Sequence, residues 1–146
     1  MNGFLVTGHG NFASGILSSM ELVAGEQEYV LGVDFLKSYS TQDLKVKLLE
    51  AVSALRQGCD SIIILTDLKG GSPFNVSVTL KMEEHQLPIE VISGTNFPML
   101  LSGVFGREGA AVKNLAQSMV EDGQSGIDTF VFSSSEKKVD EEEDGI

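Results

Sequence analysis

One histidine stands where a ligand can approach the backbone closely. The short apolar run from Phe4 to Thr7 ends in Gly8-His9-Gly10, and an apolar run of this kind predicts a buried strand that ends in a loop. Such a loop would present the imidazole of His9 at the end of a strand, where chemistry is expected. The alternative is a turn histidine with no chemical task. What the rest of the chain places beside His9 decides between the two.

A second segment with chemical potential lies at 66–75. It follows the continuous apolar run at 61–65, which is typical of a strand covered on both faces, and it begins with Thr66-Asp67. Ser72 followed by Pro73 predicts a helix start, with the Ser72 hydroxyl as the N-cap and Pro73 at the first helical position.

The remaining pattern alternates between the two kinds of element. We expect helices at 12–24, from 41 to a stop at Gly58, from 72 to about 84, at 99–105 and at 110–120, and further strands at 29–35, 89–92 and 129–132. This alternation predicts an α/β domain, doubly wound around a mainly parallel sheet with right-handed crossovers. In the strand order 2-1-3-4 the first and third strands are neighbours. Since ligands bind at the carboxyl ends of such strands, His9 and Asp67 would meet in one crevice.

A carboxylate beside an imidazole has a specific chemical effect. By accepting a hydrogen bond from one ring nitrogen it fixes the tautomer and leaves the other nitrogen unprotonated and nucleophilic. Helix starts add unpaired backbone N–H groups and a positive dipole end, which together favour a phosphate. The combination suits a histidine that accepts and gives up a phosphoryl group.

A dinucleotide site is the main competing interpretation. Residues 8–13 fit the fingerprint G-x-G-x-x-G/A after a strand, and Asp34 lies about twenty residues further on. The chain is short for a second nucleotide-binding half plus a substrate domain, and the fingerprint leaves Asp67 and the Ser72 helix start unexplained.

Other chemistries find less support. A P-loop is excluded because no G-x-x-x-x-G-K-[ST] occurs, and Ser72 is a poor nucleophile candidate because Pro73 and Phe74 break the G-x-S-x-G pattern. No cluster of Cys and His offers metal ligands, so we expect no metal, and His85 is expected to be solvated at a polar helix end.

Composition narrows the class of protein. The 146 residues predict one domain, 1–132, followed by an acidic tail at 133–146 that we expect to be disordered. The net charge of -11 argues against nucleic acid. A single cysteine, Cys59, favours a reducing, cytoplasmic setting and is expected to be a half-buried filler. Neither a signal peptide nor a membrane span is expected.

Three ordered motifs resemble those of the IIA domain of the mannose-class (mannose, fructose, sorbose) sugar phosphotransferase system. They are G-H-G after the first strand, D-x-x-G-G-S-P-F-N at 67–75, and G-x-N-x-P-M-L at 94–100. The resemblance covers about residues 1–132. It implies parallel strands in the order 2-1-3-4 and a fifth, antiparallel strand, 129–132, exchanged between the subunits of a homodimer.

The resemblance also implies a function. A IIA domain is a cytoplasmic phosphocarrier that takes a phosphoryl group from the phosphohistidine of HPr and passes it to a IIB component, which serves the membrane components IIC and IID. His9 would be the phosphorylated residue and Asp67 its orienting carboxylate. Gly10, Gly70, Gly71 and Ser72 would contact the phosphoryl group, with no cofactor. Since no IIB motif follows, IIB is expected to be a separate partner.

Two alternatives stay open. Similar domains act as phosphorylatable sensors in transcription regulators and in dihydroxyacetone kinase systems, but the run Gly70 to Asn75 favours sugar transport. An inactive relative is disfavoured because His9 and Asp67 are both present. The transported sugar is not readable from this chain, because a IIA domain need not touch it.

Overall fold

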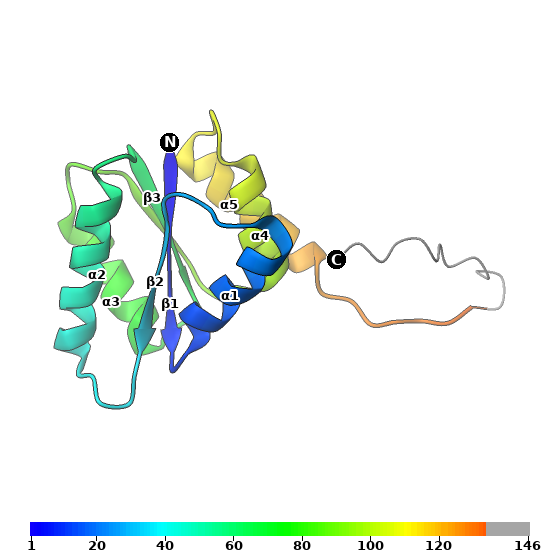
Figure 1. Cartoon of the computed structure of the whole chain (residues 1–146), viewed down its shortest axis with the longest axis horizontal. Coiled ribbons are helices and arrows are strands. Elements are labelled where there is room, and N and C mark those ends of the chain that lie inside the picture. The colour runs from blue at the N-terminus through cyan, green and yellow to red at the C-terminus, as the bar shows by residue number, and fades with distance from the viewer. Residues whose placement is uncertain (134–146) are drawn as a thin grey trace.

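The computed structural model describes residues 1–133, which fold around one parallel sheet (Figure 1). The strands are β1 (Asn2–His9), β2 (Val30–Phe35), β3 (Ser61–Thr66) and β4 (Ile89–Ile92). They lie in the order β2-β1-β3-β4, and all three pairings are parallel. The predicted α/β class and strand order are therefore confirmed. Strand β1 has β2 on one side and β3 on the other.

Five helices cover the two faces of the sheet. They are α1 (Phe12–Ala24), α2 (Thr41–Leu55), α3 (Ser72–Glu83), α4 (Phe97–Gly106) and α5 (Val112–Ser125). Helices α2 and α3 lie on one face, and α1, α4 and α5 lie on the other (Figure 1). Alternate residues of β1 serve the two cores: Phe4 and Val6 pack toward α1, α4 and α5, whereas Leu5 packs toward α2 and α3. Helices cover both faces of the sheet, which is why β1 and β3 consist almost entirely of buried residues.

Side-chain caps define three helix starts at the carboxyl end of the sheet. The backbone N–H of Ser14 in α1 donates to Asp34 Oδ1 of β2 over 2.9 Å. Ser40 and Asp43 form a reciprocal capping box at the start of α2. At the start of α4, Asn96 accepts the N–H of Met99 over 3.1 Å. These bonds hold the loops on the side of the sheet where the strands end.

The start of α3 differs from the prediction. Gly71, not Ser72, occupies the N-cap position, the helix begins at Ser72, and no side chain caps it. Gly71 takes an extended conformation, with φ -73° and ψ 166°, and its carbonyl accepts the N–H of Asn75 over 2.9 Å. Because that bond already forms the first turn, the Ser72 hydroxyl remains available for other contacts.

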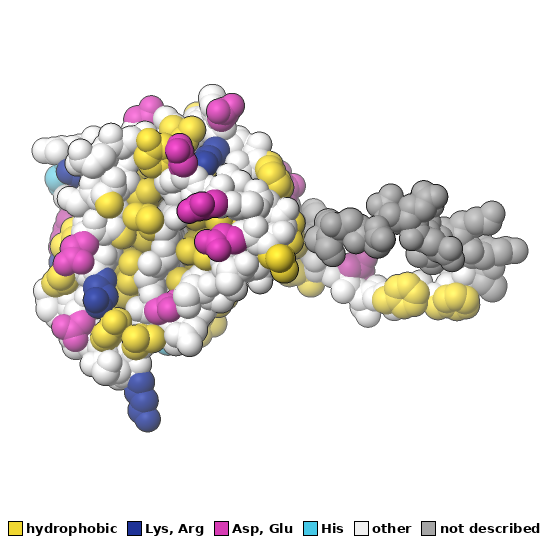
Figure 2. All heavy atoms as spheres, in the orientation of Figure 1, with side chains coloured by type: hydrophobic (Ala, Val, Ile, Leu, Met, Phe, Trp, Pro, Cys, Tyr) yellow, Lys and Arg dark blue, Asp and Glu magenta, His cyan; other side chains and the backbone are white. Residues whose placement is uncertain are grey.

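The carboxyl-terminal part also departs from the sequence pattern. Helix α5 continues to Ser125, beyond the predicted end at 120, because the buried Gly123 lets the helix pack closely against Met99. Residues 129–132 form no strand within the described chain. They extend away from the body, and apolar side chains line this extended segment (Figures 1 and 2). Apart from Ser133, the predicted acidic tail lies outside the described residues.

Two kinds of structure are absent from residues 1–133. No helix there is both long enough and apolar enough for a membrane span. No group of three or more His, Cys, Asp or Glu side chains there is arranged to hold a metal ion. Cys59 is a free thiol, buried in the core toward α2, and this burial raises its pKa.

Candidate active site

The imidazole of His9 lies at the edge of the sheet, where β1 ends. Its side chain is 48% exposed, although the seven preceding residues of β1 are buried. Gly10 follows with φ +59°, a left-handed conformation that favours glycine, and its N–H donates to the carbonyl of Phe35 over 2.8 Å. The chain thus turns away from the sheet directly after His9 and leaves the ring accessible.

Asp67 follows β3 and reaches across to His9. A single oxygen, Oδ2, accepts the backbone N–H of His9 over 2.8 Å and lies 2.8 Å from Nδ1 of the ring. A carboxylate can only accept hydrogen bonds, so Nδ1 carries the proton, and in the neutral ring Nε2 is the unprotonated nitrogen. The predicted meeting of His9 and Asp67 at the ends of neighbouring strands is confirmed.

The ionisation of Asp67 is shifted by opposing effects. Burial of its side chain, which is 15% exposed, raises the pKa. The hydrogen bonds from the backbone and ring of His9, and the positive charge that His9 can carry, lower it and prevail. The pKa of Asp67 therefore lies below its ordinary value, and the group is a carboxylate at neutral pH. Its other oxygen, Oδ1, is buried with no hydrogen-bond partner within residues 1–133.

Two further groups touch the imidazole. The ring of Phe35, on the neighbouring strand β2, meets it edge to face, with ring centroids 5.9 Å apart and planes inclined by 62°. The backbone of Gly71 approaches on another side: a Cβ atom at Gly71 would lie 2.7 Å from Cε1 and 3.4 Å from Nε2. Phe35 was not predicted as a site residue from the sequence. The predicted strand order could have indicated it, because that order pairs the last residue of β2 with the last residue of β1.

Gly8 must also be small. A Cβ atom there would lie 2.6 Å from the ring of Phe12 and 2.9 Å from Cγ of Asp67. The glycine therefore lets Asp67 reach the backbone of His9 and lets α1 start close to the end of β1. Of the two glycines that flank His9, Gly10 is needed for its left-handed backbone conformation, whereas Gly8 is needed because a side chain would not fit there.

The loop before α3 is held by its own bonds. Gly70 has φ +83°, and its carbonyl accepts the side-chain amide of Asn75 over 3.0 Å. The N–H of Gly71 donates to Leu68 over 3.1 Å. Among the described residues, neither the N–H of Gly70 nor the hydroxyl of Ser72 has a hydrogen-bond partner. The structure thus brings Gly71 against His9 and leaves two donors free nearby in the chain.

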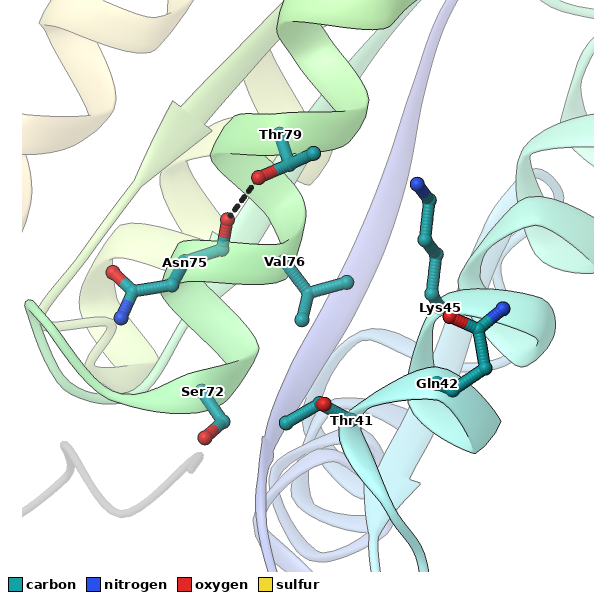
Figure 3. A pocket seen from close by; sticks show the side chains of 7 residues that line it. All are labelled: Thr41, Gln42, Lys45, Ser72, Asn75, Val76 and Thr79. Carbon is teal, nitrogen blue, oxygen red and sulfur yellow. Dashed lines mark hydrogen bonds between the residues drawn. The ribbon is translucent and has the colours of Figure 1, made fainter.

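A polar hollow of about 290 Å³ lies between α2 and α3. Ser72 and Thr41 approach from the two helices, and Val76 points between them (Figure 3). The lining is completed by Gln42, Lys45, Asn75 and Thr79. The Lys45 side chain in this lining already forms an ion pair, with its Nζ 3.1 Å from a carboxylate oxygen of Glu83. The hollow was not predicted, and through Ser72 it borders the loop that contacts His9.

The structure argues against a dinucleotide site, because the acidic residue that such a site needs has another role. Asp34 lies at the predicted position near the end of β2, but Oδ1 of its carboxylate accepts the N–H of Ser14 and caps α1. A ribose contact would compete with this cap. His85, the other histidine of the chain, is exposed after the end of α3 and is not part of the His9–Asp67 pair.

The comparisons with known proteins agree on one family. The model of the EIIA-man family, described as the PTS system fructose IIA component, matches residues 3–120. The fructose-specific EIIA component of Bacillus subtilis (strain 168) is 27% identical over 79% of this chain and 77% of its own length. The mannose-specific EIIAB component of Escherichia coli (strain K12) is 31% identical over 82% of this chain. The chain spans only 36% of that larger protein.

A solved structure supports the same assignment. The phosphotransferase system component EIIA from Streptococcus agalactiae has 40% sequence identity to this chain and a TM-score of 0.82. The match covers 88% of this chain and 97% of the streptococcal chain. The chain therefore belongs to the mannose-class IIA family, whose members are phosphocarrier components of sugar phosphotransferase systems.

Proposed function

We propose that this protein accepts a phosphoryl group from phospho-HPr on Nε2 of His9 and transfers it to a IIB component. One observation carries the proposal: Asp67 Oδ2 lies 2.8 Å from Nδ1 and leaves Nε2 as the unprotonated nitrogen of a half-exposed ring. A nitrogen with a free lone pair and open access is what a phosphoryl acceptor requires.

The transfer step needs no metal or nucleotide. The Nε2 lone pair of His9 forms a bond to phosphorus while the P–N bond of the donor histidine breaks, and the bonding electrons return to the donor nitrogen. His9 keeps its proton on Nδ1, so its ring becomes positively charged. The Asp67 carboxylate at 2.8 Å balances this charge. Since donor and acceptor are both imidazoles, the step is nearly thermoneutral, and the phosphoryl group can pass on to IIB by the same route.

The loops around His9 would hold the phosphoryl oxygens. The N–H of Gly70 and the hydroxyl of Ser72 have no partner among residues 1–133 and are the proposed donors. Gly10 and Gly71 would contribute close approach instead of a donor, because their N–H groups already bond to Phe35 and Leu68.

The proposal includes the wider assembly that the family resemblance implies. HPr is the donor, IIB is the acceptor, and through IIB the protein would serve membrane components IIC and IID from the cytoplasmic side. Residues 129–132 would pair as a fifth, antiparallel strand with a second subunit of a homodimer. The exposed Phe130 and the outer edge of β4, which has no neighbouring strand in the described chain, support this pairing.

The relatives do not select a sugar. The names of similar proteins include fructose-, mannose- and sorbose-specific components, so similarity alone favours none of the three. Specificity is expected to lie in the IIB and membrane components.

Phosphoryl labelling tests the proposal directly. The purified protein is incubated with HPr, the general phosphotransferase enzyme and labelled phosphoenolpyruvate. His9→Ala serves as the test variant, and His85→Ala serves as a control that changes the other histidine. We expect acid-labile, alkali-stable label on the wild type and on His85→Ala, and none on His9→Ala. Label on His9→Ala, or an unlabelled wild type beside phosphorylated HPr, would refute the proposal.

A further inference from the structure

The bond to Asp67 restrains the plane of the His9 ring but leaves it some range. Nδ1 lies off the axis of the χ2 torsion, so the 2.8 Å bond to the carboxylate limits rotation to what a hydrogen bond tolerates. The intrinsic minima of χ2 are broad and do not narrow this range further. In-line transfer depends on where Nε2 points. Contacts that narrow the remaining range therefore matter for transfer.

Phe35 provides one such contact from a fixed position. It pairs with His9 in the parallel register of β1 and β2, and its ring meets the imidazole edge to face at 5.9 Å. The Phe35 side chain itself packs against the core toward α2, and its carbonyl accepts the N–H of Gly10. Edge-to-face packing is a preferred arrangement of two aromatic rings, so this contact favours one orientation of the imidazole.

Gly71 limits the ring from a second loop. A Cβ atom at Gly71 would lie 2.7 Å from Cε1, the carbon between the two ring nitrogens, and real Cβ atoms essentially never come that close to another heavy atom. The φ of Gly71 is -73°, which any residue can adopt. An alanine here would fit the backbone conformation but would force the imidazole to move from its present position.

We propose that Phe35 and Gly71 are positioning residues that hold the His9 ring in the orientation in which Nε2 meets its phosphoryl donor. The proposal rests on the proposed function. Asp67 sets the tautomer and the approximate plane of the ring, and Phe35 and the backbone of Gly71 narrow the range that remains. The ring is then ordered before the donor arrives, so little freedom is lost at the moment of transfer.

Three variants test the two contacts separately. Phe35→Leu keeps an apolar side chain against the α2 core but removes the aromatic edge, and Phe35→Tyr restores an aromatic ring. Gly71→Ala adds the methyl group that the imidazole excludes. Leu31→Ala is the control, because Leu31 lies on the same strand and packs against the same core without touching His9.

The first measurement is rapid-quench transfer from phospho-HPr. We expect Phe35→Leu and Gly71→Ala to lower the rate constant at saturating phospho-HPr by about tenfold, with the half-saturating concentration changed less than twofold. Phe35→Tyr should recover most of the rate. Leu31→Ala should melt earlier but transfer at the wild-type rate. A purely structural role for Phe35 would instead lower the melting temperature alone.

The second measurement needs no transfer at all. With selective ¹³C labelling of histidine, relaxation of the His9 Cε1–H bond should show a more mobile ring in Phe35→Leu than in wild type and Leu31→Ala. Wild-type ring order in Phe35→Leu would overturn the inference, as would wild-type rate constants in both Phe35→Leu and Gly71→Ala. An unlabelled wild type would refute the proposed function, and the ring-order measurement would still decide whether the contacts position His9.

Discussion

At the residue scale, one carboxylate oxygen of Asp67 performs two tasks. Oδ2 accepts the backbone N–H of His9 and also bonds to the ring. The first bond ties the end of β1 to the end of β3, and the second sets the tautomer. Both tasks depend on the carboxylate form, which the lowered pKa of Asp67 maintains at neutral pH.

Loss of this carboxylate should slow transfer strongly. We expect Asp67→Ala to reduce the rate of His9 phosphorylation by about 100-fold, because the tautomer is no longer fixed and the charge that develops on the ring is no longer balanced. Asp60→Ala is the matched control, since Asp60 is exposed and bonds to the N-terminal amine outside the site. Unchanged kinetics in Asp67→Ala would remove this residue from the mechanism.

The same pKa shift predicts how stability depends on pH. The folded-state pKa of Asp67 lies below its ordinary value of 3.8, so the unfolded state binds a proton more readily as the pH falls. The stability that the carboxylate contributes is therefore complete above the unfolded-state pKa and is lost as the pH falls through the folded-state pKa.

Urea unfolding at several pH values measures this contribution. We expect the difference in free energy of unfolding between wild type and Asp67→Asn to shrink as the pH falls from about 5 to below about 4. A difference that grows over this range would contradict the prediction.

At the element scale, the sequence specified the core elements well and their ends less well. Apolar periodicity was sufficient for α1 and β4, whose predicted bounds match the structure. The hydroxyl of Ser72 suggested a cap, but whether a side chain bonds back to the helix depends on the conformation of the preceding loop. Glycines at 70 and 71 shaped that loop so that Gly71 took the cap position.

The chemical contacts show the same division. His9 and Asp67 could be predicted as a pair because strand order alone brings their loops together. Phe35 could not, since an aromatic residue at the end of a strand is more often a core residue, and its contact with His9 depends on side-chain orientation. The hollow beside Ser72 depends on the spacing of two helices, which no local pattern reports.

The capping box of α2 gives a prediction about stability. Ser40 accepts the N–H of Asp43 over 3.0 Å, and Asp43 accepts the N–H of Ser40 over 2.9 Å. We expect Ser40→Ala to lower the free energy of unfolding by about 1 kcal/mol, because a helix donor is left without its partner. Ser53→Ala, at an exposed position in the last turn of α2, should be neutral or slightly stabilising. Equal effects of the two variants in urea unfolding would show that the cap contributes nothing.

At the scale of the whole molecule, the sheet order decides where chemistry can occur. Because β1 lies between β2 and β3, the ends of all three strands meet at its carboxyl end. His9 and Phe35 are the last residues of β1 and β2, and Asp67 directly follows β3. The opposite end of the sheet carries the chain start. There the N-terminal amine lies 2.9 Å from Asp60, away from the site.

The carboxyl-terminal segment gives the last prediction, which concerns assembly. Phe130, Val131 and Phe132 are 84%, 69% and 77% exposed. Exposure of neighbouring apolar side chains to water is unfavourable and is typical of an interaction surface. One edge of β4 has no neighbouring strand in the described chain, and its unpaired backbone groups can accept another strand. Burial of these side chains on a second subunit would remove both costs at once.

Two truncations measured by light scattering after size exclusion test this assembly. We expect the full chain to be a dimer at micromolar concentration and a chain ending at Gly126 to be a monomer. A chain ending at Ser133 keeps the apolar segment and should remain a dimer, which separates the effect of this segment from that of the acidic residues after it. A monomeric full chain, or a dimer that survives truncation at Gly126, would show that residues 127–133 do not join the subunits. Because Phe130, Val131 and Phe132 lie beyond α5 and far along the chain from His9, the monomer should keep the His9–Asp67 pair and still accept a phosphoryl group.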